Sequence, residues 1–258
     1  MIKQGSAYWL DYSKNQTKNF TVIELASTQR AISNFVKILT HKEIPVEYIT
    51  NNGSSYTNGE RITISSVISR ETIDSVVGLA LHEGAHCIHT DFYFLNHNIE
   101  EYLKTHNIPP SAKDMVLGLT NFVEDRRIDF IVYKSAPGYK AYYRSMYLRY
   151  FYNEHVNVGL KGPEFRSEDW DSYLFRIINI FNKNTDLKAL ANLEEIYHLI
   201  DLENINRLES VKGSINIAIE IYKLIFESVK MPPEQKQEQN TRNQEGTQGE
   251  GIGKSELK

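Results

Sequence analysis

Two histidines and a glutamate lie close together in the segment 81–86, LHEGAH. The histidines are four residues apart, so on an α-helix they lie about 40° apart around the axis and one turn apart along it. Both imidazoles can therefore reach one tetrahedral metal ion, for which zinc is the usual choice. Glu83 lies at the flank of the pair, where it can act as general base toward a water that the ion has acidified. The segment predicts zinc-assisted hydrolysis, with His82 and His86 as ligands and Glu83 as the catalytic residue.

A catalytic zinc site needs a third protein ligand and an open fourth position. The best source is the segment 121–129, NFVEDRRID, in an expected helix. On a helical wheel Glu124 shares its face with Leu117 and Ile128, and a buried carboxylate needs a metal or a cation. We therefore expect Glu124 to be the third ligand. Asp125, about 100° away, is either the alternative ligand or a hydrogen-bond partner of a ligating histidine.

Four further residues are candidates for supporting roles. His89 shares the face of His86, but it lies about 10 Å along the axis from His82 and is expected to be an outer partner or structural. Asp91 follows the end of the same helix and either orients a histidine or caps a local turn. The oxyanion of a tetrahedral intermediate needs an added donor, for which Tyr143 or His155 is available.

Composition limits the class of protein. The chain has 258 residues with a net charge of −4, which argues against nucleic acid as a partner even though the aromatic segment 139–155 contains basic residues. The hydrophobic share of 41% is enough for one substantial core. The single cysteine, Cys87, excludes an internal disulfide and is expected to be an inert core residue. Without a leader or an apolar span, a soluble, cytoplasmic protein with no membrane partner is expected.

The pattern along the chain predicts an α+β fold that is mostly α-helical, with a small N-terminal β-sheet and a helical C-terminal portion. Short β-like pieces are expected at 7–11 and 20–24, a helix at 27–41 capped by Ser27, and two pairing strands at 45–50 and 60–65. Helices are expected at about 70–90, 93–106, 111–134, 138–155, 168–182, 187–203 and 208–230. Residues 1–231 should form one domain, and 232–258, rich in Gln, Glu, Asn and Gly, a disordered polar tail or linker.

The order of these features resembles a known family. A strand at 61–65, the segment 82–86, HTDF at 89–92 and EDRRI at 124–128 are similar to zincin-type metallopeptidase domains that precede a von Willebrand factor A domain. Such domains occur in bacterial and phage proteins related to cobaltochelatase subunits. The resemblance implies a zincin-like fold, Zn²⁺ on His82, His86 and Glu124, and a peptide or protein substrate.

Two functions of different classes follow. The first is a zinc-dependent metallopeptidase in which Glu83 is the general base and the strand at 61–65, as a sheet edge, holds an extended substrate by main-chain pairing. The second is a non-catalytic interaction module with a structural zinc site that works with a von Willebrand factor A domain or an ATPase. An open fourth metal position distinguishes the enzyme from the module.

Overall fold

The computed structural model describes residues 4–5, 20–49, 54–65 and 67–229. Within them four strands form one sheet in the order β1-β3-β4-β2. The strands are β1 (Gln4–Gly5), β2 (Val46–Ile49), β3 (Tyr56–Thr57) and β4 (Ile62–Ser65). As predicted, β2 and β4 pair, in parallel and with Val46 opposite Ile62, while β3 is antiparallel to both β1 and β4.

Helices make up most of the described chain, so the prediction of a mostly helical α+β fold is confirmed. The α-helices are α1 (Val22–Thr40), α2 (Ile73–His89), α3 (Phe92–His97), α4 (Ile99–Thr105), α5 (Lys113–Ser135), α6 (Lys140–Phe151), α7 (Glu154–Lys161), α8 (Trp170–Ile178), α9 (Leu193–Ile200) and α10 (Val211–Ser228). Short 3₁₀ turns cover Pro110–Ala112, Pro137–Tyr139 and Leu202–Arg207.

Several predicted boundaries were wrong. Helix α1 begins before Ser27, because Thr21 and Glu24 form a capping box, so residues 22–24 are helical rather than β-like. The expected helix 93–106 is broken at Asn98 into α3 and α4, and the expected helix 138–155 ends at Phe151, before an unpredicted α7 capped by Asn153. The predicted strand 7–11 and the predicted tail 232–258 lie outside the described residues.

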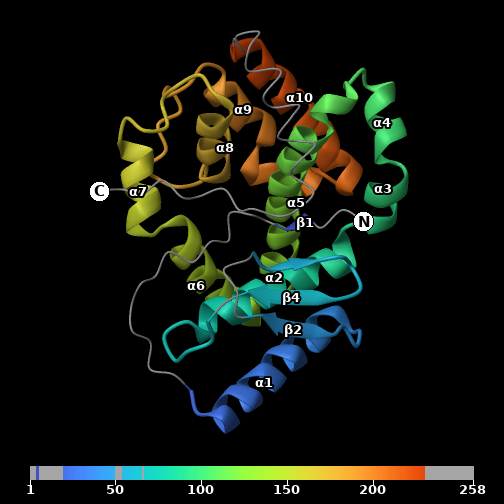
Figure 1. The fold of residues 1–258 in the computed structure, drawn as a ribbon, viewed down its shortest axis with the longest axis vertical. Coiled ribbons are helices and arrows are strands. Elements are labelled where there is room, and N and C mark those ends of the chain that lie inside the picture. The colour runs from blue at the N-terminus through green and yellow to red at the C-terminus, as the bar shows by residue number, and fades with distance from the viewer. Residues whose placement is uncertain (1–3, 6–19, 50–53, 66, 230–258) are drawn as a thin grey trace.

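Two hydrophobic cores meet along α5. The sheet, α1, α2 and α6 share one core, and α3, α4, α8, α9 and α10 share the other. Phe122 and Val123 of α5 belong to the second core, whereas Ile128 and Val132, further along the same helix, belong to the first. In Figure 1, α1, β2 and β4 lie in the lower part of the molecule and α9 and α10 at the upper end, with α5 between them.

Helix α6 packs closely on α2. Four of its side chains are buried, namely Tyr143, Met146, Tyr150 and Phe151. A Cβ atom at Gly78 of α2 would lie 2.4 Å from the carbonyl oxygen of Tyr142, so glycine is what permits this approach. Of the aromatic residues in the segment 139–155, Tyr143, Tyr150 and Phe151 are buried in the core that α6 shares with α2.

The strand predicted to hold a substrate is not an edge of the sheet. Strand β4 lies between β3 and β2, all four of its residues are buried, and the Ser65 amide donates to the Ser55 hydroxyl. Its main chain is therefore already paired, and the expectation of substrate pairing along residues 61–65 is wrong.

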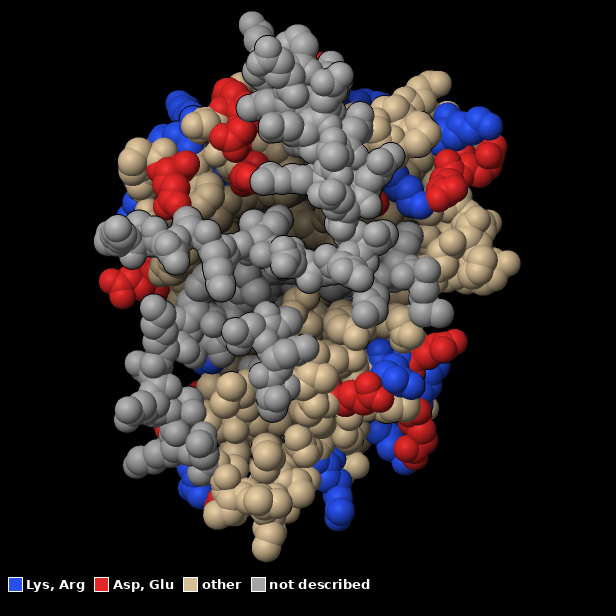
Figure 2. Space-filling model, in the orientation of Figure 1, with Lys and Arg blue, Asp and Glu red and all other residues tan. Residues whose placement is uncertain are grey.

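On the face shown in Figure 2, acidic and basic side chains of the described residues are interspersed rather than gathered by sign. No helix in the described part of the chain combines the length and the apolar character that a membrane span requires.

Candidate metal centre

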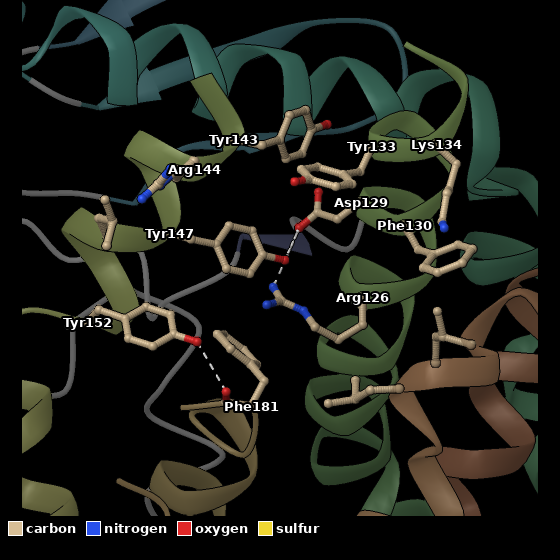
Figure 3. A pocket seen from close by; sticks show the side chains of 13 residues that line it. Arg126, Asp129, Phe130, Tyr133, Lys134, Tyr143, Arg144, Tyr147, Tyr152 and Phe181 are labelled. Carbon is tan, nitrogen blue, oxygen red and sulfur yellow. Dashed lines mark hydrogen bonds and ion pairs between the residues drawn. The ribbon is translucent and has the colours of Figure 1, made fainter. Parts of the chain in front are cut away.

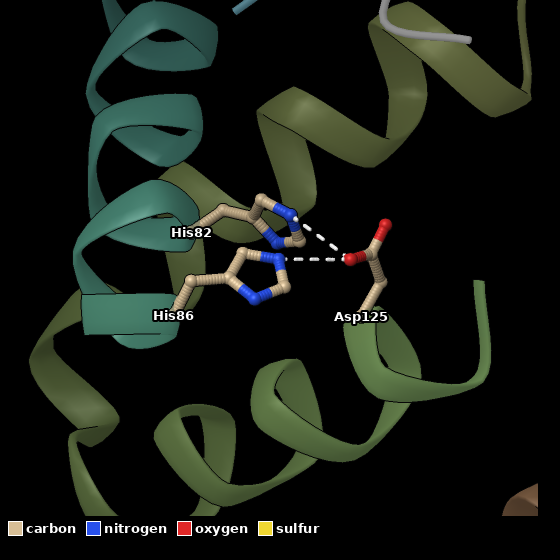
Figure 4. A group of neighbouring side chains, drawn as sticks. All are labelled: His82, His86 and Asp125. Carbon is tan, nitrogen blue, oxygen red and sulfur yellow. Dashed lines mark hydrogen bonds and ion pairs between the residues drawn. The ribbon is translucent and has the colours of Figure 1, made fainter. Parts of the chain in front are cut away.

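Helices α2 and α5 bring two histidines and one carboxylate together. His86 Nε2 lies 2.9 Å from Asp125 Oδ1, and His82 Nε2 lies 3.6 Å from the same oxygen. One ligand atom from each of the three residues lies within 4.8 Å of the other two, and Figure 4 shows both rings turned toward the Asp125 carboxylate. All three residues are buried, with exposed fractions of 0% for His82, 4% for His86 and 0% for Asp125. This group is a candidate metal centre.

The carboxylate beside the histidines is Asp125, not Glu124 as expected. The Glu124 oxygens accept hydrogen bonds from Arg127 Nε at 2.7 Å and Nη2 at 2.6 Å, from Thr90 Oγ1 at 2.7 Å and from Ser214 Oγ at 2.8 Å. The buried cation that Glu124 requires is thus the Arg127 guanidinium, which also donates to the His89 carbonyl oxygen. Glu124 therefore ties α5 to the end of α2 and to α10.

The outer nitrogen of each histidine has a hydrogen-bond acceptor. His82 Nδ1 lies 2.7 Å from Asp129 Oδ1, and an ionised carboxylate can only accept, so this nitrogen donates. His86 Nδ1 lies 3.0 Å from Thr90 Oγ1, whose own proton goes to Glu124, so this nitrogen also donates. In neutral rings both Nε2 atoms then present lone pairs toward Asp125. Such outer partners fix the ring orientation and tautomer that a metal ligand needs.

Asp129 remains an acceptor because its neighbours favour the ionised form. Burial by itself would raise its pKa, but His82, Arg126 and the Tyr147 hydroxyl lower the pKa further than burial raises it. The Tyr147 hydroxyl donates to Asp129 Oδ2 at 2.6 Å. Burial, more than the neighbouring charges of His82 and Arg127, lowers the pKa of His86 well below that of an exposed histidine.

Glu83 lies beside the histidines in an apolar setting. It is 2% exposed, and no donor among the described residues reaches its Oε1 atom. Burial raises its pKa to about 7, an effect that the charge of His82 opposes and the charge of Asp129 reinforces. A carboxylate oxygen without a hydrogen-bond donor, close to His82, is available to accept a proton.

Of the other predicted residues, some lie near the metal group and others do not. Burial raises the pKa of Tyr143 well above that of a free tyrosine, and the nearby charges of Asp129 and Glu83 add to this shift. His155 is exposed on α7 and belongs neither to the metal group nor to the cavity described below, so the structure does not bring it to the candidate metal centre. Asp91 caps α3 by accepting from the Phe94 amide, and His89 is half-buried, with its carbonyl oxygen bound to Arg127.

Sequence reasoning missed Asp129 and Thr90, although a signal for Asp129 was present. Asp125 and Asp129 are four residues apart, the same spacing as His82 and His86. The two pairs face one another in opposite order, His86 with Asp125 and His82 with Asp129. Four residues are about one helical turn, so equal spacing on two antiparallel helices lets each residue of one pair face one residue of the other.

A cavity of about 540 Å³ adjoins this group. Asp129, Tyr143 and Tyr147 line it, and Figure 3 shows the Tyr147 hydroxyl directed at the Asp129 carboxylate. Its exposed lining residues, which include Tyr133 and Leu148, open it to solvent. The ligand candidates His82, His86 and Asp125 are not part of the lining, so Asp129 stands between the cavity and the metal group.

Comparison with protein-family models, with curated proteins and with solved structures gives no match to this chain.

Proposed function

We propose that this chain is a zinc-dependent hydrolase of the metallopeptidase class with a zincin-like fold, in which His82, His86 and Asp125 hold the ion. The observation that carries the proposal is the convergence of two histidine Nε2 atoms on one carboxylate oxygen, with each Nδ1 held by an acceptor. Lone pairs on the two Nε2 atoms are repelled by a carboxylate unless a cation or a shared proton lies between them, and His86 Nε2 and Asp125 Oδ1 are within hydrogen-bond distance of each other. Zinc fits this donor set better than calcium or magnesium, which prefer oxygen ligands.

The distances are close to those of a tetrahedral site. With bonds of about 2.0 Å from zinc to nitrogen and oxygen, neighbouring ligand atoms lie about 3.3 Å apart. The two measured separations to Asp125 Oδ1, 2.9 Å and 3.6 Å, fall on either side of that value. Three protein ligands would leave a fourth position for a small molecule.

Each nearby residue has a task in hydrolysis. A bound zinc ion would polarise a substrate carbonyl and acidify a water. Glu83 would take the proton of that water and pass it to the leaving amine, which its lack of hydrogen-bond donors at Oε1 permits. The Tyr143 hydroxyl, which has no hydrogen-bond partner among the described residues, would donate to the oxyanion that forms on the carbonyl oxygen.

A second candidate function is supported by burial. The three ligand candidates are almost fully enclosed and do not line the cavity, as is common for metal sites that only hold helices together. In that case the chain is an interaction module, stabilised by zinc between α2 and α5, whose activity depends on a partner such as a von Willebrand factor A domain or an ATPase.

Metal content and one substitution distinguish these candidates. Protein purified without added metal should contain about one zinc per chain, and a His82→Ala/His86→Ala variant should contain none. For the enzyme, Glu83→Gln should retain zinc and lose peptide hydrolysis. If the wild-type protein and the Glu83→Gln variant both bind zinc and neither hydrolyses a peptide library, only the interaction module remains. Hydrolysis unchanged in Glu83→Gln would refute the role assigned to Glu83.

A further inference from the structure

Arg126 is a buried cation whose donors are not used by the described residues. It is 5% exposed, yet Nε, Nη1 and Nη2 have no hydrogen-bond partner within the described chain. Its nearest acid oxygen, Asp129 Oδ2, lies 3.7 Å away and already accepts from Tyr147. A guanidinium carries five N–H donors, and leaving them unmet in a buried site costs free energy.

Aromatic rings surround this guanidinium instead of acceptors. Its central carbon lies between 4.9 and 5.5 Å from the ring centroids of Phe122, Tyr147, Phe151 and Phe181. Such rings compensate part of the charge but satisfy none of the N–H groups in the plane of the guanidinium. The rings thus hold the guanidinium in place while its donors remain available.

Arg126 lies in the wall of the cavity, with its guanidine nitrogens almost fully buried. Arg126 lines it, and Figure 3 shows the guanidinium extending from α5 toward Tyr147 and Phe181. The Tyr143 hydroxyl is a second buried donor without a partner among the described residues that line this space. Lys134 and Arg144, which are exposed, add positive charge to the lining. Among these described lining residues the one acid is Asp129, whose two oxygens are engaged by His82 and Tyr147.

The other residues that line the cavity indicate the chemistry of the rest of the ligand. Apart from these polar groups the described lining is aromatic or aliphatic, with Phe130, Tyr133, Leu148, Leu202 and Ile205 among its residues. One forked guanidinium matches a carboxylate, which it can bind through two parallel hydrogen bonds. The volume of about 540 Å³ is ordinary for a small-molecule or short-peptide site.

We infer that this cavity binds the C-terminal carboxylate of a peptide with an apolar last residue, through the Arg126 guanidinium. A single carboxylate, Asp129, separates this guanidinium from His82 of the candidate metal centre, which favours a peptide over an unrelated acid. Use of the bound peptide as a substrate rests on the proposed hydrolase, whereas binding itself does not. Hydrolysis would then remove residues from the C-terminal end of the peptide.

The test compares ligands that differ only in the carboxylate. Binding of N-acetyl-Ala-Phe and of its C-terminal amide is measured by isothermal titration calorimetry, with zinc and after chelator treatment. The acid should bind about 10- to 100-fold more tightly than the amide in both conditions, since hydrogen bonds to charged groups are the strong ones. Equal affinity for acid and amide would overturn the inference, whatever the metal content. An acid preference in a protein that neither binds zinc nor hydrolyses peptides would uphold the binding site and refute the proposed function.

Variants and a smaller ligand sharpen the result. Arg126→Gln should abolish the acid preference and Arg126→Lys should keep part of it. Arg176→Gln, which removes another fully buried guanidinium outside the lining of this cavity, should leave it unchanged. An acid preference that survives in folded Arg126→Gln would overturn the assignment. If 3-phenylpropionate binds as tightly as the peptide acid, the ligand is a free aromatic acid and the peptide assignment is wrong.

Discussion

The two adjacent acids on α5, Glu124 and Asp125, should respond differently when each is replaced by its amide. Asp125→Asn removes the carboxylate that lies 2.9 Å from His86 Nε2. Glu124→Gln removes the carboxylate that pairs with Arg127 and accepts from Thr90 and Ser214. Both substitutions keep the shape of the side chain, so each serves as the matched control of the other. We expect Asp125→Asn to affect metal affinity and Glu124→Gln to affect stability.

The sizes of the two effects follow from the contacts. Structural zinc sites bind with about 10 to 16 kcal/mol, so an equal share for one ligand of three is about 3 to 5 kcal/mol. That share corresponds to a dissociation constant raised roughly 10²- to 10⁴-fold. Removing one partner of a buried ion pair costs about 3 to 5 kcal/mol of folding free energy. The Glu124 carboxylate is 1% exposed and accepts four hydrogen bonds, so its loss falls in that range.

Affinity and stability are measured separately. Zinc affinity is obtained by competition with a chromophoric chelator at a temperature at which every variant is folded. Stability is obtained from urea unfolding of protein freed of metal. A folded Glu124→Gln protein that loses zinc while Asp125→Asn retains wild-type affinity would refute the ligand assignment and restore Glu124 as the third ligand. Wild-type affinity in both variants would show that neither acid is a ligand.

Three further predictions concern packing and the outer partners of the histidines. Gly78→Ala should lower the free energy of unfolding in a urea titration by about 1 to 3 kcal/mol, because its Cβ would lie 2.4 Å from the Tyr142 carbonyl oxygen. The control Gly84→Ala, whose Cβ would have its nearest contact at 3.4 Å, should be neutral or stabilising in the same titration. Asp129→Asn should weaken zinc binding about 10- to 100-fold by releasing His82, and unchanged affinity would contradict that role. Cys87, which is buried and hydrogen-bonded to Thr57, should react with a thiol reagent only after unfolding, and rapid labelling of the native protein would contradict the packing.

Local patterns predicted most of the secondary structure. Helix α2 and the first half of α5 carry apolar residues at helical spacing, and strand β4 alternates polar and apolar residues, so their types and approximate bounds could be read directly. The start of α1 was misplaced because Ser27 was chosen over the capping box formed by Thr21 and Glu24. Helix α7 was missed because the preceding aromatic segment continues the helical pattern past Phe151.

The pairing of strands was only partly accessible. The pairing of β2 with β4 was expected, although not its parallel direction. Strand β3 is two residues long and lies in a turn-like segment, where no periodicity can develop. Its presence turned the expected edge strand into an interior one. Short strands are stabilised by their partners rather than by their own sequence, so their existence is decided by tertiary contacts.

The sequence by itself determined the helical majority and the two histidines that share one face of α2, because periodicity and a spacing of four depend only on neighbours along the chain. Only the tertiary structure decided which acid meets them. Glu124 and Asp125 differ by about 100° around α5, and a helical wheel places Glu124 on the apolar face without showing what lies opposite either acid. Because Arg127 and Ser214 satisfy Glu124, whereas α2 brings His82 and His86 to Asp125, the choice was made by the positions of α2 and α10 around α5.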